Sequence, residues 1–197
     1  MCGFGEKDRR LIDPPPILRL NMYHEPGQPV TDYRAVDASC FVCLATVWSA
    51  DGHEERGVVV NPSSIPIQPS FPSANVIALN DPSPTRNLIG STVVSAQCLN
   101  DLNGQPGLFF VFSDLAIRTE GMFSLKFNFV PLGSGPADSW APIDRNWQVC
   151  CLAHSSPFEV FSPRKFPGLT ESTELSRCFA DQGVKISIRR KGPAKQG

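Results

Sequence analysis

The chain has 197 residues and a mass of 21.5 kDa, with 41% apolar and 19% charged residues. This length suits one large domain, and the composition is too apolar for a disordered chain. The formal net charge of −1 conceals a segregation: basic and acidic residues number four and three in residues 1–20, six and thirteen in residues 21–159, and eight and three in residues 160–197. Nucleic-acid binding therefore depends on whether the fold brings the two basic ends together.

No segment of the sequence has the pattern of a membrane span or a secretory signal. The longest uncharged apolar runs, residues 40–49 and 107–112, are much shorter than the roughly 20 residues of a membrane helix. The first residues lack the apolar core of a signal peptide. The seven cysteines, an odd number without regular spacing, favour reduced thiols in an intracellular protein over a disulfide framework.

Most of the predicted elements are β-strands. In chain order they cover residues 17–23, 40–48, 93–99, 108–112, 122–129, 147–153, 158–161 and 184–189. Three of them, residues 17–23, 122–129 and 184–189, alternate between apolar and polar side chains, which is typical of antiparallel strands with one buried face. The others are short apolar runs, which predict more deeply buried strands. The stripe of Phe123, Phe127 and Phe129 is expected to be core rather than a platform for stacking bases.

Proline-rich stretches predict the long connections. The run of prolines at residues 14–16 predicts an extended approach to the first strand. Six prolines lie between residues 57 and 85, and because proline cannot donate in a β-ladder, they predict a long irregular insertion at about residues 50–91. Residues 131–145 form a second predicted loop, rich in proline and glycine.

One helix is predicted near the C-terminus. Residues 170–174 offer Ser or Thr as an N-cap, followed by acidic side chains that favour a helix N-terminus. Leu175, Cys178 and Phe179 then form one apolar stripe, and Gly183 lies where a helix would stop. Short antiparallel strands, long loops and one late helix predict a mainly β, sandwich-like domain over residues 1–191, with residues 192–197 as a flexible tail.

The sequence shows no pattern that requires a metal, a cofactor or a catalytic centre. Cys40 and Cys43 have redox-motif spacing, but residues three apart on a strand point to opposite faces, and no second pair completes a zinc site. His24, His53 and His154 are scattered, and no nucleophile elbow or phosphate-binding loop is present. The patterns favour a protein that is not an enzyme and that needs neither metal nor cofactor.

The candidate binding segment is the loop of residues 3–10, named here the cationic loop. It contains Lys7, Arg9 and Arg10 and directly precedes the rigid proline run. Loops held by a rigid scaffold often carry binding residues. Arginine forks suit guanine edges and phosphates, and lysine suits phosphates. Glu6 and Asp8 dilute the positive charge.

Three blocks of sequence resemble a known family. Residues 2–17 (CGFGEKDRRLIDPPPI) resemble the opening signature of the velvet domain of fungal regulators. Residues 107–114 (GLFFVFSD) and 120–127 (EGMFSLKF) are similar to its central strands, and residues 166–176 (FPGLTESTELS) and 179–185 (FADQGVK) to its closing block. The blocks occur in the family's order and span nearly the whole chain.

This resemblance implies an immunoglobulin-like β-sandwich, similar to the DNA-binding domain of Rel-type factors. It implies a nuclear, sequence-specific regulator of fungal development, sporulation and secondary metabolism that binds double-stranded DNA as a homodimer or heterodimer with another velvet protein. The family's DNA contacts map to Lys7, Arg9 and Arg10, and the Rel analogy adds Arg164 and Lys165. It implies no cofactor, membrane or small-molecule substrate.

A second interpretation is a protein-interaction scaffold that pairs with other velvet proteins without binding DNA itself. In that case the basic residues 189–191 would serve nuclear import. A heterodimer that forms while neither state binds DNA would distinguish the scaffold from the DNA-binding regulator.

Overall fold

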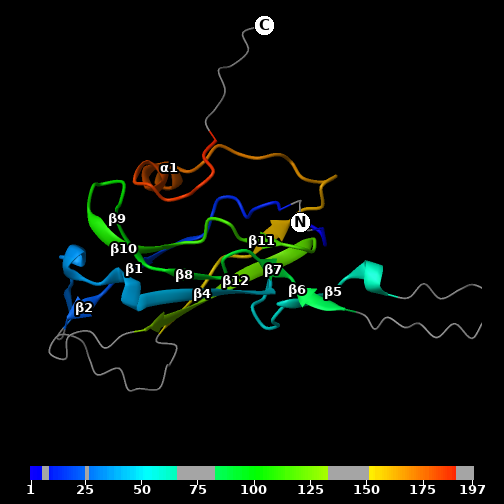
Figure 1. Cartoon of the computed structure of the whole chain (residues 1–197), viewed down its shortest axis with the longest axis horizontal. Coiled ribbons are helices and arrows are strands. Elements are labelled where there is room, and N and C mark those ends of the chain that lie inside the picture. The colour runs from blue at the N-terminus through cyan, green and yellow to red at the C-terminus, as the bar shows by residue number, and fades with distance from the viewer. Residues whose placement is uncertain (6–8, 25–26, 66–82, 133–150, 190–197) are drawn as a thin grey trace, which may run out of the picture.

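The computed structural model describes residues 1–5, 9–24, 27–65, 83–132 and 151–189. Over these residues the chain consists mainly of short antiparallel strands (Figure 1). The strands are β1 (Ile17–Leu20), β2 (Tyr23–His24), β3 (Gln28–Pro29), β4 (Phe41–Ser49), β5 (Val58–Val60), β6 (Pro84–Arg86), β7 (Leu88–Ile89), β8 (Val93–Ser95), β9 (Gln97–Asn100), β10 (Pro106–Val111), β11 (Ala116–Ile117), β12 (Gly121–Pro131), β13 (Cys151–His154) and β14 (Phe158–Val160). Short 3₁₀ helices cover Tyr33–Ala35, Ala38–Cys40 and Pro62–Ser64, and helix α1 covers Glu174–Asp181.

Two sheets form the body of the molecule. The larger sheet has the order β13-β12-β4-β8. Strand β14 pairs with the first residues of β12, and β13 pairs with residues further along the same strand. Its centre is the long pairing of β12 with β4, in which Leu125 lies opposite Val47 and Phe127 opposite Ala45. The smaller sheet has the order β1-β10-β9. Two-stranded ribbons, β7–β11, β2–β3 and β5–β6, surround these sheets.

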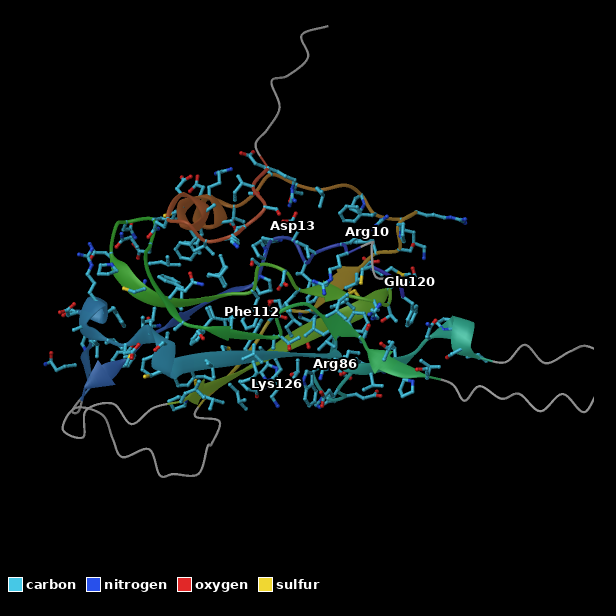
Figure 2. The ribbon with its side chains drawn as sticks, viewed as in Figure 1. Arg10, Asp13, Arg86, Phe112, Glu120 and Lys126 are labelled. Atoms are coloured by element: carbon cyan, nitrogen blue, oxygen red, sulfur yellow. The ribbon has the colours of Figure 1, made fainter. Side chains whose placement is uncertain are left out.

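The main core lies between the two sheets, as the alternating sequence pattern predicts. Phe112, directly after β10, packs against Phe127 of β12 with ring centroids 5.3 Å apart, and Figure 2 shows Phe112 within this layer. Phe110 meets the ring of Phe129 edge-on at 6.1 Å. The predicted core role of the Phe123, Phe127 and Phe129 stripe is confirmed, because these side chains are buried or packed against the core. The arrangement is consistent with the predicted β-sandwich.

Helix α1 forms a third layer on the other side of the smaller sheet (Figure 1). Its fully buried Phe179 contacts Phe109 of β10 edge-on, with ring centroids 4.8 Å apart. The hydroxyl of Thr173 accepts a hydrogen bond from the amide of Ser176 at 3.2 Å, so the predicted N-cap is confirmed. Because β10 is covered on both faces, its sequence is a continuous apolar run rather than an alternating one.

Three predicted elements differ from the structure. Residues 93–99 are two strands rather than one, because the chain crosses at Ala96 from β8 in the larger sheet to β9 in the smaller. Residues 184–189 form no strand: Val184 and Ile186 pack near α1, but no described strand pairs with this segment. The insertion predicted to be irregular contains the β5–β6 ribbon, since Val59 pairs with Thr85.

Some predictions fall on residues that are not described. These are most of the loop at residues 131–145, the first half of the predicted strand at 147–153, and the C-terminal tail. In the described part of the chain, no helix is both long and apolar enough to cross a membrane.

Candidate nucleic-acid interface

The cationic loop is tied at both ends to one short stretch of chain, residues 115–118. At the start of the loop, the amides of Cys2 and Gly3 donate to carbonyls of this stretch at 2.9 and 3.1 Å. After the loop, the amide of Ile12 donates to the carbonyl of Leu115 at 2.7 Å. Both ends of the loop are therefore fixed to β11 and its flanking residues, and the loop is presented at the rim of the sandwich.

Arg118 strengthens the base of the loop. Its Nη1 donates to the carbonyl of Gly3 at 3.0 Å, and its Nε donates to the carbonyl of Arg86 at 3.0 Å. The guanidinium carbon also lies 6.0 Å from the centroid of the Phe4 ring. One side chain thus joins the cationic loop, the segment after β11 and strand β6. These contacts make Arg118 a positioning residue.

Of the predicted site residues in the loop, Arg9 and Arg10 are described and Lys7 lies outside the described residues. Arg9 Nη1 lies 3.8 Å from Asp114 Oδ2, and its side chain is 51% exposed. A pair this long and this exposed contributes little to stability, so Arg9 can exchange Asp114 for another anion. Arg10 is exposed on the arm that crosses above the sheets (Figure 2).

The carboxylate of Asp114 is held in place from the opposite side. Ser91 donates to it twice, from its amide at 2.8 Å and from its hydroxyl at 3.2 Å. Asp114 therefore remains fixed beside the loop while the longer side chain of Arg9 can move.

The second predicted pair, Arg164 and Lys165, lies in a turn between β14 and α1. The amide of Lys165 donates to the carbonyl of Ser162 at 3.1 Å, and both cationic side chains are exposed. Phe161 and Phe166, on either side of this turn, line the same groove as Arg9 and Arg10. The fold therefore brings the turn that holds Arg164 and Lys165 to the groove that Arg9 and Arg10 line.

Two further arginines, Arg86 and Arg118, lie at the base of the loop and are absent from the predicted site. Each is a single arginine between uncharged neighbours, so no local charge pattern marks it. Arg86 is exposed on the β5–β6 ribbon and adds a cation near the base of the loop, whereas Arg118 is half-buried and uses its donors on carbonyls. Their positions follow only from the contacts that the folded chain makes at the base of the loop.

The cations of this rim carry guanidinium and ammonium groups, a chemistry that suits phosphates and base edges. The carboxylates of Asp114 and Glu159 lie in the same region. At the base of the loop, burial raises the pKa of the Cys2 thiol, against the opposing influence of Arg118. Among the described residues, no group of three or more His, Cys, Asp or Glu side chains is placed to hold a metal ion.

Comparison with known proteins identifies the family. The family model described as velvet factor matches residues 1–192, almost the entire chain. The chain belongs to the velvet family. This velvet chain is 32% identical to a velvet complex subunit of Emericella nidulans, over 100% of the chain and 76% of that protein. It is 31% identical to velvet complex subunit RYP3 of Ajellomyces capsulatus, over 98% and 75%. It is 37% identical to the sexual development regulator umv3 of Mycosarcoma maydis, over the whole chain but 43% of that protein.

The three velvet-like sequence blocks have distinct structural roles. The opening block forms the cationic loop, the proline run and the start of β1. The central blocks form β10 and the first half of β12, the strands that carry the core. The closing block forms helix α1 and the segment that leads into it. The resemblance therefore covers both the scaffold and the loop that it holds.

Proposed function

We propose that this velvet chain is a sequence-specific DNA-binding regulator of fungal development, sporulation and secondary metabolism. It works in the nucleus, with shuttling to the cytoplasm, as a homodimer or as a heterodimer with another velvet protein. The names of its relatives, velvet complex subunits and a sexual development regulator, support the regulatory role.

The observation that carries the proposal is the shared rim. Arg9 and Arg10, from one end of the sequence, line a groove at the edge of the sandwich, and Phe161 and Phe166, on either side of the turn that holds Arg164 and Lys165, line the same groove. Hydrogen bonds at both ends of the cationic loop, and the contacts of Arg118, limit the entropy lost when the loop binds DNA.

The cations divide into two roles in this proposal. Lys7, Arg164 and Lys165 contact phosphates, which fixes the position of the domain on the duplex. Arg9 and Arg10 reach base edges in the major groove, where an arginine fork recognises guanine. Asp114 holds Arg9 loosely in the free protein and releases it to the DNA.

The test is a gel shift on the preferred duplex at matched salt. The double variant Arg9→Ala, Arg10→Ala should lose about 1–3 kcal/mol of binding free energy for each arginine that reads a base. Each lost phosphate contact should lower the slope of log affinity against log salt by about one unit. The control variant Arg34→Ala, Lys185→Ala removes the same charge from exposed positions that do not line the groove. Equal affinities of wild type and the loop variant would refute the assignment of these two arginines.

The second candidate function is the interaction scaffold, which the name "velvet complex subunit" of several relatives favours. It is distinguished by measuring affinity for random duplex between low and physiological salt, with the chain alone and with a velvet partner. A heterodimer that forms while neither state binds DNA would favour the scaffold and exclude the DNA-binding role.

A further inference from the structure

The connection between β14 and α1 contains neither helix nor strand, and its residues 163–171 are all exposed to solvent. It begins with a turn in which the amide of Lys165 donates to the carbonyl of Ser162 at 3.1 Å. The rings of Phe161 and Phe166 lie 6.2 Å apart on either side of this turn. In the described part of the chain no strand pairs with these residues, so opening the turn breaks one backbone hydrogen bond and one aromatic contact and costs little.

The hydroxyl of Ser162 has no role in holding the fold together. Ser162 is half-buried, and no residue that the structure describes forms a hydrogen bond with its Oγ. Arg164 and Lys165, two and three residues further on, are exposed and form no ion pair with any described carboxylate. A negative charge placed on Ser162 would therefore meet two cations that have no other charged partner among the described side chains.

The residues after Ser162 match the pattern that proline-directed protein kinases recognise. Pro163, at the next position, has no amide donor, so it fits a kinase pocket in which any other residue would leave an amide N–H without a partner. Lys165, at the third position, supplies the positive charge that a subset of these kinases pairs with an acidic site. The turn thus presents a serine, a proline and a cation in the order that such a kinase requires.

The sequence contains three Ser-Pro steps, which begin at Ser83, Ser156 and Ser162. Ser156 has Glu159 at its third position, which reverses the required charge. Ser83 has Arg86 at its third position, so it carries the same pattern as Ser162. The motif alone therefore leaves Ser83 and Ser162 as candidates.

The structure separates these two candidates. The amide of Ser83 donates to Ser64 Oγ at 2.9 Å, and its carbonyl accepts from the amide of Asn61 at 3.3 Å. The residues after Ser83 form β6, which pairs with β5. A kinase active site takes its substrate as an extended chain with free backbone, so binding at Ser83 would break this ribbon, whereas binding at Ser162 opens a single turn.

We propose that Ser162 is a phosphorylation site for a proline-directed protein kinase, and that its phosphate weakens DNA binding by pairing with Arg164 and Lys165. In the reaction a bond forms between Ser162 Oγ and the γ-phosphorus of ATP, and the bond from that phosphorus to the β–γ bridging oxygen breaks. ADP leaves, and the hydroxyl proton passes to the base of the kinase. The phosphate carries a charge of about −1.5 to −2 at pH 7, which offsets the adjacent cations. The effect on DNA binding rests on the proposed function, whereas the modification itself does not.

The first experiment locates the phosphate. The full, folded chain is incubated with ATP and a purified cyclin-dependent kinase bound to its cyclin, and tandem mass spectrometry identifies the modified residue. The phosphate is expected on Ser162, so Ser162→Ala should take up little, while the matched variant Ser156→Ala should take up as much as the wild type. Unchanged uptake by Ser162→Ala, or phosphate on Ser83 as fast as on Ser162, would overturn the assignment.

A second pair of variants tests recognition of the cation. Lys165→Ala should lower kcat/KM for phosphorylation of Ser162 by about tenfold, the effect of losing one hydrogen bond to a charged group. The control Lys185→Ala removes an exposed lysine that is distant in sequence from Ser162 and should leave this rate unchanged. Equal rates for Lys165→Ala and the wild type would contradict recognition of the turn by this class of kinase.

The third experiment measures the effect on DNA. Gel shifts on the preferred duplex, over a series of salt concentrations, compare the chain before and after phosphorylation. Phosphorylation should weaken binding and lower the slope of log affinity against log salt by about two units, one for each cation that the phosphate occupies. Kinase-treated Ser162→Ala should bind as the untreated chain does.

The outcomes separate this inference from the proposed function. Equal duplex binding by the two forms, with Ser162 fully modified, would overturn the regulatory effect alone. A chain that binds no duplex in either form would refute the proposed function and with it the regulatory effect, while phosphate on Ser162 would still support the site.

Discussion

Gly90→Ala should destabilise the fold more than an ordinary glycine replacement, because two penalties coincide there. Gly90 has a φ of +104°, a backbone angle that residues other than glycine rarely adopt. A Cβ at this position would also lie 2.2 Å from the backbone carbonyl oxygen of Asp114, about 1 Å closer than ordinary contact. Strain costs about 1–2 kcal/mol and displacing packed backbone about 1–3 kcal/mol, so the expected loss is about 2–5 kcal/mol.

The matched control is Gly104→Ala. Gly104 also has a positive φ, +74°, but a Cβ there would have no atom within 4 Å. Its loss should therefore be limited to the backbone strain of about 1–2 kcal/mol. Urea unfolding of both variants, followed by far-ultraviolet circular dichroism, measures the two losses. Equal losses would refute the reasoning, because they would mean that the backbone around Asp114 moves aside without cost.

Three further predictions concern the helix layer, a buried thiol and a turn carboxylate. Phe179→Ala should lower the free energy of unfolding by about 3–5 kcal/mol in urea titrations, since it empties the contact between α1 and β10; a loss below about 1 kcal/mol would contradict that role. Burial, and then the nearby Cys151, raise the pKa of Cys43 to about 12, so at pH 8 Ellman's reagent should label the exposed Cys98 rapidly and Cys43 only after unfolding. Hydrogen bonds to Asp101, first among them that from the amide of Gln105, lower the pKa of its carboxyl group from 3.8, so the carboxylate stabilises the fold above that pH and loses this effect as the pH falls. The stability difference between wild type and Asp101→Asn should therefore shrink below pH 3.8. A difference that grew instead would contradict this role of the carboxylate.

The sequence predicts those strands that carry a clear pattern of apolar side chains. The alternating residues 122–129 fall in β12, which faces the core on one side. The apolar run at 108–112 falls mostly in β10, which is covered on both sides. The crossing at Ala96 is not marked in the sequence, because no proline or glycine separates β8 from β9. Residues 184–189 show the converse: their alternation does correspond to packing near α1, but a strand also needs a neighbour to bond with.

The candidate site is predictable only in part for a similar reason. The cationic loop stands out because its charges are adjacent in sequence, and this local pattern selects Arg9 and Arg10. That the turn holding Arg164 lies beside the groove that Arg9 and Arg10 line follows only from folding, because residues far apart in the chain line that groove. Arg118 has no local signal, because its role depends on the carbonyl groups it meets after folding.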